Sequence, residues 1–343
     1  MTDRQALNEE PPVIRRLIEL LTEEHDSAVT LGAPSTSSGE GFDSQIHFVR
    51  LAGTTLEHDW KRDLVVRVKR TSDQHDLAIR ERDIHQWLND RSYPTPPILR
   101  VFAPGEMTDL PVQIILRAPG TMMLDAVKSR PWRAKSMIAM LASTHARLHR
   151  MDPTGFPGSG ADLLDRRLSL TRETAVALDD AELTAALATV NATTSSLRDS
   201  PGVACHGDYH PLNVMVDGNN VAVIDWTDAG IGDLHGDVAR TSLLFDLAAI
   251  AAGSRVERAL LGRVGPRLGR WYLDAYRNIN PVDDARLALW RPVHILHGWS
   301  QVRGLRAGLF DPEGERSNDA ARLPPNLDDT LKTMFEQALS GLP

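Results

Sequence analysis

The stretch from Cys205 to Asp237 constrains the fold most, because it arranges polar side chains around a short hairpin. Val214–Val216 and Val221–Ile224 are β-branched runs typical of strands. The sequence Asp217–Asn220 between them is turn chemistry, since Asp, Gly and Asn tolerate positive φ or bond their own backbone. A hairpin of this kind holds the loop before it beside the loop after it.

The two loops carry oxygen-bearing side chains that suit a hard cation. Asp208 and Asn213 precede the predicted hairpin, and Asp225 follows it. Two carboxylates and an amide oxygen are ligands for Mg²⁺ and not for zinc. The sequence therefore predicts a magnesium site that includes Asn213 and Asp225.

The spacing of these residues is that of a kinase catalytic loop. Protein kinases place a catalytic Asp five residues before a metal-binding Asn, and Asp208 and Asn213 have the same separation. The pattern H-G-D-x-H-P-x-N, followed by I-D-W at Ile224–Trp226, resembles the aminoglycoside phosphotransferase and choline kinase family. The sequence Ile224–Ala229 is also similar to the macrolide phosphotransferases.

This resemblance implies an α+β, protein-kinase-like fold of two lobes with a cleft between them. Residues 1–118 would form a strand-rich, nucleotide-binding lobe, and residues 119–343 a mostly helical catalytic and substrate-binding lobe. The implied reaction moves the γ-phosphate of ATP to a hydroxyl of a small molecule, which could be an aminoglycoside, a macrolide or a metabolite. ATP is the expected co-substrate, with GTP as an alternative.

The resemblance also assigns roles in the catalytic stretch. Asp208 would accept or orient the proton of the substrate hydroxyl, while Asn213 and Asp225 would hold Mg²⁺. His206 would support the loop, and Asp237 would tie the loops together through backbone N–H groups.

Asp63–Arg70 predicts a strand whose alternate side chains have different functions. Leu64, Val66 and Val68 would face the core of the first lobe. On the other face, the kinase order places Val65 over the adenine and Arg67 at the phosphates. Glu81, in a helix predicted over Leu77–Asn89, would pair with Arg67. Lys69 is the alternative phosphate cation; we expect it to be exposed toward the end of the strand.

Two further segments of the first lobe are candidates for nucleotide contacts. Gly32–Ser44 reads as a small-residue loop, in which backbone N–H groups can approach phosphates. The segment after the strand at Pro111–Leu116 resembles the kinase hinge. The nucleotide-binding candidates from these segments are Ser38, Gly39, Gly41, Leu116 and Ala118.

Composition limits the other classes of function. The formal net charge is −8, which disfavours a nucleic-acid partner. Cys205 is the only cysteine, so no intrachain disulfide can form. We see neither a signal sequence nor an apolar run of membrane-spanning length, and we expect a cytoplasmic protein with no membrane partner. The oligomeric state is not predicted.

Three alternatives remain open at this stage. The chain could be a catalytically silent nucleotide-binding or scaffold protein of the same fold. His145 and His149 are spaced i,i+4 on a predicted helix and could bind zinc. A structural role is favoured, because the H-E-x-x-H pattern of zinc-binding helices is absent. The helices after Val256 would choose the acceptor, and their aromatic and histidine side chains could line a pocket or only pack. A protein kinase is less favoured than a small-molecule kinase, because a helix predicted over Val238–Gly253 leaves little room for an activation loop after Asp225.

Overall fold

The structure, a computed structural model, describes residues 10–38, 44–158, 162–248, 250, 255–309 and 323–342. The chain divides into two compact units. The first comprises Met1–Thr121 with Met215–Thr227, and the second comprises Met122–Val214 with Asp228–Pro343. We describe each unit by itself. The predicted α+β class is confirmed, because the first unit contains an antiparallel sheet and the second is mostly helical.

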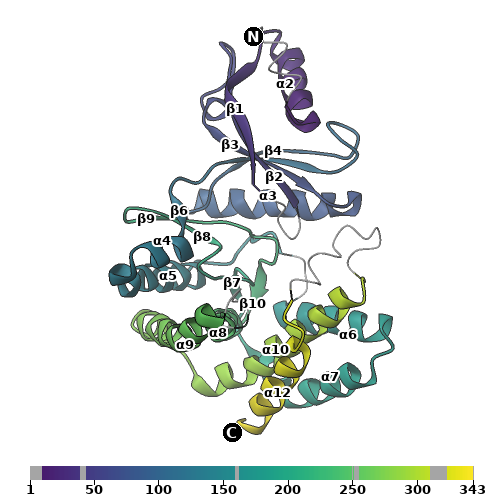
Figure 1. Ribbon diagram of the computed structural model, residues 1–343, viewed down its shortest axis with the longest axis vertical. Coiled ribbons are helices and arrows are strands. Elements are labelled where there is room, and N and C mark those ends of the chain that lie inside the picture. Colours follow the sequence, from purple (N-terminus) through teal and green to yellow (C-terminus); the bar gives the residue numbers. More distant parts are fainter. Residues whose placement is uncertain are drawn as a thin grey trace. The chain divides into compact units, whose positions relative to one another are not determined.

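The first unit is built on a five-stranded sheet with the order β1-β2-β3-β5-β4 (Figure 1). Every neighbouring pair in the sheet is antiparallel. The strands are β1 (Thr30–Ser38), β2 (Ser44–Ala52), β3 (Asp63–Lys69), β4 (Ile98–Phe102) and β5 (Val112–Leu116). Helix α2 (Pro12–His25) precedes the sheet, and α3 (His75–Asp90) connects β3 to β4.

The two faces of β3 differ as the period-two pattern predicts. Leu64, Val66 and Val68 are buried, and they share one apolar cluster with the buried stripe of α2. The opposite face of β3 carries Arg67 and Lys69. One face of the sheet therefore forms the core of this unit, while the other carries charged groups.

The prediction of a loop over Gly32–Ser44 is wrong for its first half. Strand β1 runs from Thr30 to Ser38 and pairs with β2 through two irregularities in register. The small polar residues of β1 hid a strand because they carry no alternating apolar pattern. Gly39 and Gly41 lie outside the described residues.

The predicted hairpin is present as β8 (Val214–Asp217) and β9 (Asn220–Val223). The short strand β6 (Thr121–Met122) adds to β8. Gly120, just before β6, has φ +88°, and a Cβ there would lie 2.1 Å from the Val216 carbonyl oxygen. Only glycine fits this approach. The lobe boundary after Ala118 stays a prediction.

The second unit contains mostly helices, with a two-stranded pairing of β7 (Val203–Cys205) and β10 (Gly230–Gly232). Its helices are α4 (Met123–Ser129), α5 (Ala134–His149), α6 (Leu163–Ala177), α7 (Ala181–Thr193), α8 (Leu234–Leu247), α9 (Arg255–Arg277), α10 (Asp284–Arg306) and α12 (Leu327–Ser340). Helix α8 begins four residues before the predicted start at Val238, because an aspartate caps its first turn.

Aspartates begin four of these helices. In each case the side chain accepts a hydrogen bond from a backbone N–H of the first turn, the preferred way to satisfy an otherwise unpaired donor. The capping residues of α6, α7, α8 and α10 are Asp162, Asp180, Asp233 and Asp283.

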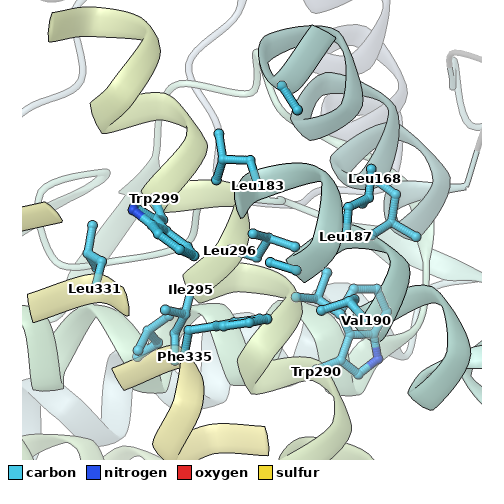
Figure 2. Packing of buried hydrophobic residues seen from close by; sticks show 14 of the residues in the cluster. Leu168, Leu183, Leu187, Val190, Trp290, Ile295, Leu296, Trp299, Leu331 and Phe335 are labelled. Atoms are coloured by element: carbon cyan, nitrogen blue, oxygen red, sulfur yellow. The ribbon is translucent and has the colours of Figure 1, made fainter. Parts of the chain in front are cut away.

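An apolar cluster joins α6, α7, α8, α10 and α12 of this unit, and Figure 2 shows part of it. Trp290 and Trp299 are each 1% exposed within it, so these two side chains pack in the core of the unit. In the described part of the chain, no helix is both long and apolar enough to span a membrane.

Candidate active site

The loop that carries Asp208 is anchored in the second unit by Asp237, in the first turn of α8. Asp237 is 2% exposed. Its carboxylate accepts the backbone N–H groups of His206 at 2.6 Å and Gly207 at 2.9 Å. Burial alone would raise the pKa of Asp237, but His145 and His149 outweigh it and hold the pKa well below its usual range. The carboxylate is therefore ionised, and it plays the structural part expected of it.

Two histidines of α5 complete the surroundings of Asp237. His145 and His149 place their Nε2 atoms 3.0 and 3.2 Å from Asp237 Oδ2. Their Nδ1 atoms lie 2.6 Å from the hydroxyls of Tyr272 and Tyr276. Because the carboxylate only accepts, each Nε2 carries the proton, and each Nδ1 accepts from a tyrosine.

This cluster has the compactness of a metal site, since the ligand atoms of His145, His149 and Asp237 lie within 4.8 Å of one another. All four ring nitrogens nevertheless have hydrogen-bond partners within the protein. Burial, with His149 nearby, lowers the pKa of His145 to about 4, so the ring is neutral. His145 and His149 thus have the structural role that the sequence favours over zinc binding.

Gly207 gives the loop a backbone shape that other residues resist. Its φ is +82°, and a Cβ at this position would lie 2.4 Å from the carbonyl oxygen of Asp228. The left-handed conformation and the close approach both require glycine. The loop thus turns sharply one residue before Asp208.

Both carboxylate oxygens of Asp208 have partners in the second unit. Arg240 of α8 donates to Oδ1 from Nε at 3.1 Å and from Nη2 at 3.0 Å. His210 Nε2 lies 3.2 Å from Oδ2, and His210 Nδ1 accepts the Leu212 N–H, so Nε2 is the protonated nitrogen. Burial would raise the pKa of Asp208, but Arg240 and His210 hold it well below its usual range. Asp208 is ionised, with its side chain 30% exposed.

Asn213 lies beside Asp208 in the same unit. Its amide nitrogen donates to the Asp208 carbonyl oxygen at 3.0 Å, which fixes the orientation of the side chain. Among the described residues no hydrogen bond reaches its amide oxygen, so that atom is available to a ligand. The structure therefore brings Asp208 and Asn213 together.

The first unit brings the other predicted charges together. Arg67 Nη1 donates to Glu81 Oε1 at 2.9 Å, as the pairing predicted, and Nη2 lies 3.4 Å from Asp225 Oδ1. Arg67 Nε donates to Ser44 Oγ at 3.0 Å. Burial would raise the pKa of Glu81, but Arg67 and Lys69 hold it well below its usual range. Glu81 is therefore a buried anion between two cations.

The expectation that Lys69 is exposed is wrong. Its side chain is 3% exposed, and Nζ lies 3.1 Å from Glu81 Oε2. Burial lowers the pKa of Lys69, and Glu81 opposes this effect. Arg67 lies within 3.4 Å of the Asp225 carboxylate, so the two cations remain distinguishable by their partners.

The structure restricts how Leu116 could contact a nucleotide. It pairs with Leu64 across β3 and β5 and packs in the apolar core, whereas Ile115 pairs with Val65. Paired residues of antiparallel strands share a face. Any nucleotide contact by Leu116 would thus come from its backbone, and Ile115 has the side chain beside Val65.

Ala118 and Ser38 are further candidates for nucleotide contact. Ala118 is 9% exposed, just beyond β5. Ser38 ends β1, and its side chain lies outside the described residues, as do Gly39 and Gly41.

Asp225 follows β9 with a backbone conformation that is uncommon for a residue with a side chain. Its φ is +62°, and such outliers concentrate at functional sites. Oδ1 accepts from the Thr227 hydroxyl at 2.9 Å and faces Arg67, while no described residue bonds Oδ2. Asn213 belongs to the second unit and Asp225 to the first.

Four residues at these sites escaped the sequence analysis. Gln113 donates to Glu81, and a polar residue inside an apolar strand could have been noticed. Arg167 of α6 binds the Gly207 carbonyl oxygen at 2.7 Å and Asp228 Oδ2 at 3.0 Å; nothing in its local sequence indicated this. The others are Ser44 and Arg240.

Comparison with known proteins identifies the family. The model of the phosphotransferase enzyme family matches residues 54–282, more than half of the chain. The chain therefore belongs to this family and is a phosphotransferase, as the catalytic-loop pattern indicated. A search of curated proteins returned no match.

Solved structures support the fold. One is a thermostable mutant of aminoglycoside phosphotransferase APH(4)-Ia in ternary complex with AMP-PNP and hygromycin B, with 17% identity, TM-score 0.62 and coverage of 95% of this chain and 99% of that one. Amicoumacin kinase hAmiN, in complex with AMP-PNP, Ca²⁺ and Ami, has 14% identity, TM-score 0.59 and coverage of 93% and 95%.

A third similar structure is a choline/ethanolamine kinase family protein from Mesorhizobium loti, with 16% identity, TM-score 0.57 and coverage of 91% and 93%. These likenesses confirm the predicted protein-kinase-like fold.

We expect the close approach at Gly207 to cost more than its backbone conformation does. Gly155 is the matched control, because its φ is +72° and a Cβ there meets nothing within 4 Å. Gly155→Ala should lower the free energy of unfolding by about 1 kcal/mol. Gly207→Ala should lower it by roughly 3 kcal/mol, since the methyl group also displaces the Asp228 carbonyl. Urea unfolding measures both; equal losses would show that the Asp228 contact does not constrain the loop.

Proposed function

We propose that this phosphotransferase moves the γ-phosphate of ATP to a hydroxyl group of a small molecule, with Asp208 as the residue that accepts or orients the hydroxyl proton. The observation that carries the proposal is the state of Asp208. It is an ionised, partly exposed carboxylate at the tip of a loop whose backbone is bound to buried Asp237. Phosphoryl transfer depends mainly on positioning, and a fixed carboxylate of this kind can position the hydroxyl group that is phosphorylated.

The donor chemistry of Asn213 and Asp225 fits Mg²⁺. Each keeps an oxygen that no described residue bonds, and a hard cation of this size prefers carboxylate and amide oxygens. When bound, Mg²⁺ would neutralise the phosphate charge that develops during transfer. One similar structure, the amicoumacin kinase, contains Ca²⁺ with AMP-PNP, which supports a divalent cation of this type.

Arg67 would bind the nucleotide phosphates, with Glu81 fixing its guanidinium. Val65 and the backbone beyond β5 would receive the base. Complexes of similar structures with AMP-PNP support ATP as the co-substrate, and GTP remains the alternative that the sequence allows. A catalytically silent role is less favoured, because Asp208, Asn213 and Asp225 are all present, and Asn213 and Asp225 each keep an oxygen that no described residue bonds.

Asp208→Asn tests the proposed function. Hydroxylated antibiotics and metabolites are first screened for ATP consumption by the wild-type protein, with EDTA as the metal-free control. On an active acceptor, Asp208→Asn should lower kcat by about 10²–10⁴-fold and leave nucleotide affinity nearly unchanged, since general-base and orienting effects have this size. A variant that keeps more than roughly a tenth of wild-type kcat would contradict the role of Asp208.

Arg67 and Lys69 should separate in their effects on ATP. Arg67→Ala should raise the KM for ATP by about tenfold or more and lower kcat, because its charge acts on ground and transition states. Lys69→Met should act mainly on stability, since it removes one partner of the buried Glu81 carboxylate. Steady-state kinetics and urea unfolding of both variants decide the matter. A larger effect of Lys69→Met on the KM for ATP would reverse the assignment.

A further inference from the structure

Arg240 places a guanidinium directly against the carboxylate that faces the acceptor. It uses only one edge, Nε and Nη2, to hold Asp208 Oδ1. No described residue accepts a hydrogen bond from Nη1, and the side chain is 18% exposed. The edge formed by Nη1 and Nη2 can therefore take an oxygen-bearing group next to Asp208, since the planar fork of arginine suits carboxylate and phosphate oxygens.

The carboxylates near Asp208 are already paired with arginines. Asp208 pairs with Arg240. Asp228 pairs with Arg167, while its backbone carbonyl accepts from Arg166. Three arginines thus contact two aspartates in this region of the second unit, which leaves an excess of positive charge.

The two other nearby carboxylates are not available. Asp237 and Asp233 are each 2% exposed. Asp237 is occupied by the loop and the two histidines, and Asp233 by Arg286, Trp290 and His235. Asp228 keeps one oxygen, Oδ1, that no described residue bonds, and its side chain is 41% exposed. Arg167 and Arg166 both lie against Asp228, so the charge around this carboxylate is still positive on balance.

We propose that the acceptor carries an anionic oxygen group, a carboxylate or a phosphate, beside the hydroxyl that it presents to Asp208, and that Arg240 binds this group through its free edge. This inference rests on the proposed function, because it takes Asp208 as the group that meets the hydroxyl. It narrows the acceptor class to hydroxylated acids and phosphate esters, and it disfavours polycationic acceptors.

Arg240 would serve two partners at once. Its side edge holds Asp208, and its end edge holds the anionic group, so the guanidinium stands between two negative charges and reduces their repulsion. An acceptor with several ammonium groups would bring positive charge against the guanidinium of Arg240. Like charges brought together in this way act against the wrong partner.

The transfer itself balances without a further reactant. The acceptor oxygen forms a bond to the γ-phosphorus while the bond from that phosphorus to the β–γ bridging oxygen breaks. ADP leaves with the bond's electron pair, and the hydroxyl proton passes to Asp208 and then to solvent. The product is a phosphomonoester that retains its anionic group.

The test uses acceptors that differ in charge on similar hydroxylated skeletons. Gluconate, glucose and glucosamine form one such set, and glycerate, glycerol and ethanolamine form a second. A wider library of hydroxy acids, phosphate esters, neutral polyols and aminoglycosides is assayed with the full-length protein and Mg·ATP for Asp208-dependent ADP release. The anionic compounds should include the acceptors with the highest kcat/KM.

Arg240→Met then separates recognition from the positioning of Asp208. Loss of the hydrogen bonds from Arg240 to Asp208 should affect every acceptor alike. The informative quantity is therefore how much more the KM changes for an acid than for its neutral counterpart. We expect the KM of the acid to rise roughly 10- to 100-fold more, the size of a lost charge-assisted hydrogen bond, while the KM for ATP changes little. Arg240→Lys should recover part of the effect. Arg291→Met, at a surface pair with Asp246, is the control and should change nothing.

Two results would overturn the inference. One is a screen in which no anionic compound is phosphorylated; Asp208-dependent activity on other compounds would then leave the proposed function standing, and its absence would remove both. The other is an active acid whose KM responds to Arg240→Met no more than that of a neutral acceptor. If Arg240→Met does not fold, as judged by circular dichroism, the screen and Arg240→Lys still decide.

Discussion

The second unit depends on one buried carboxylate. Asp237 is removed from water, and a charge in that position is tolerated only with several donors around it. It has four: two backbone N–H groups of the catalytic loop and two imidazoles that tyrosines hold in one tautomer. The cost of burying the charge is thereby offset by bonds that also fix the backbone on the N-terminal side of Asp208.

The carboxylate that we propose as the proton acceptor is arranged differently from the carboxylate that holds the loop. Asp208 is partly exposed, and its carboxylate is oriented by Arg240 and His210, so it can meet a substrate without losing its ionisation. In the first unit Glu81 is fully buried between Arg67 and Lys69. Glu81 thereby holds Arg67 where Nη2 lies 3.4 Å from Oδ1 of Asp225, a residue with a left-handed backbone conformation.

Much of this could be predicted from local sequence. The hairpin, the step from Asp208 to Asn213 and the pairing of Arg67 with Glu81 follow from turn chemistry, spacing and strand alternation. Other features depend on tertiary contacts that local sequence does not encode. Burial of Lys69 depends on a helix glutamate shared by two cations, and the face of Leu116 depends on the register between β3 and β5. Arg240 meets Asp208 only because α8 packs against the loop, which no periodicity reveals.

The hydrogen bonds to Asp237 should hold the loop rigid before any substrate binds. Backbone amide hydrogen exchange, followed by NMR, measures this directly at His206 and Gly207. We predict protection close to that of buried core amides in α10, because these N–H groups bond a buried carboxylate at 2.6 and 2.9 Å. The Leu212 amide, bonded to the His210 ring at an exposed position, should exchange much faster. Exchange at His206 and Gly207 as fast as at Leu212 would contradict a preorganised loop.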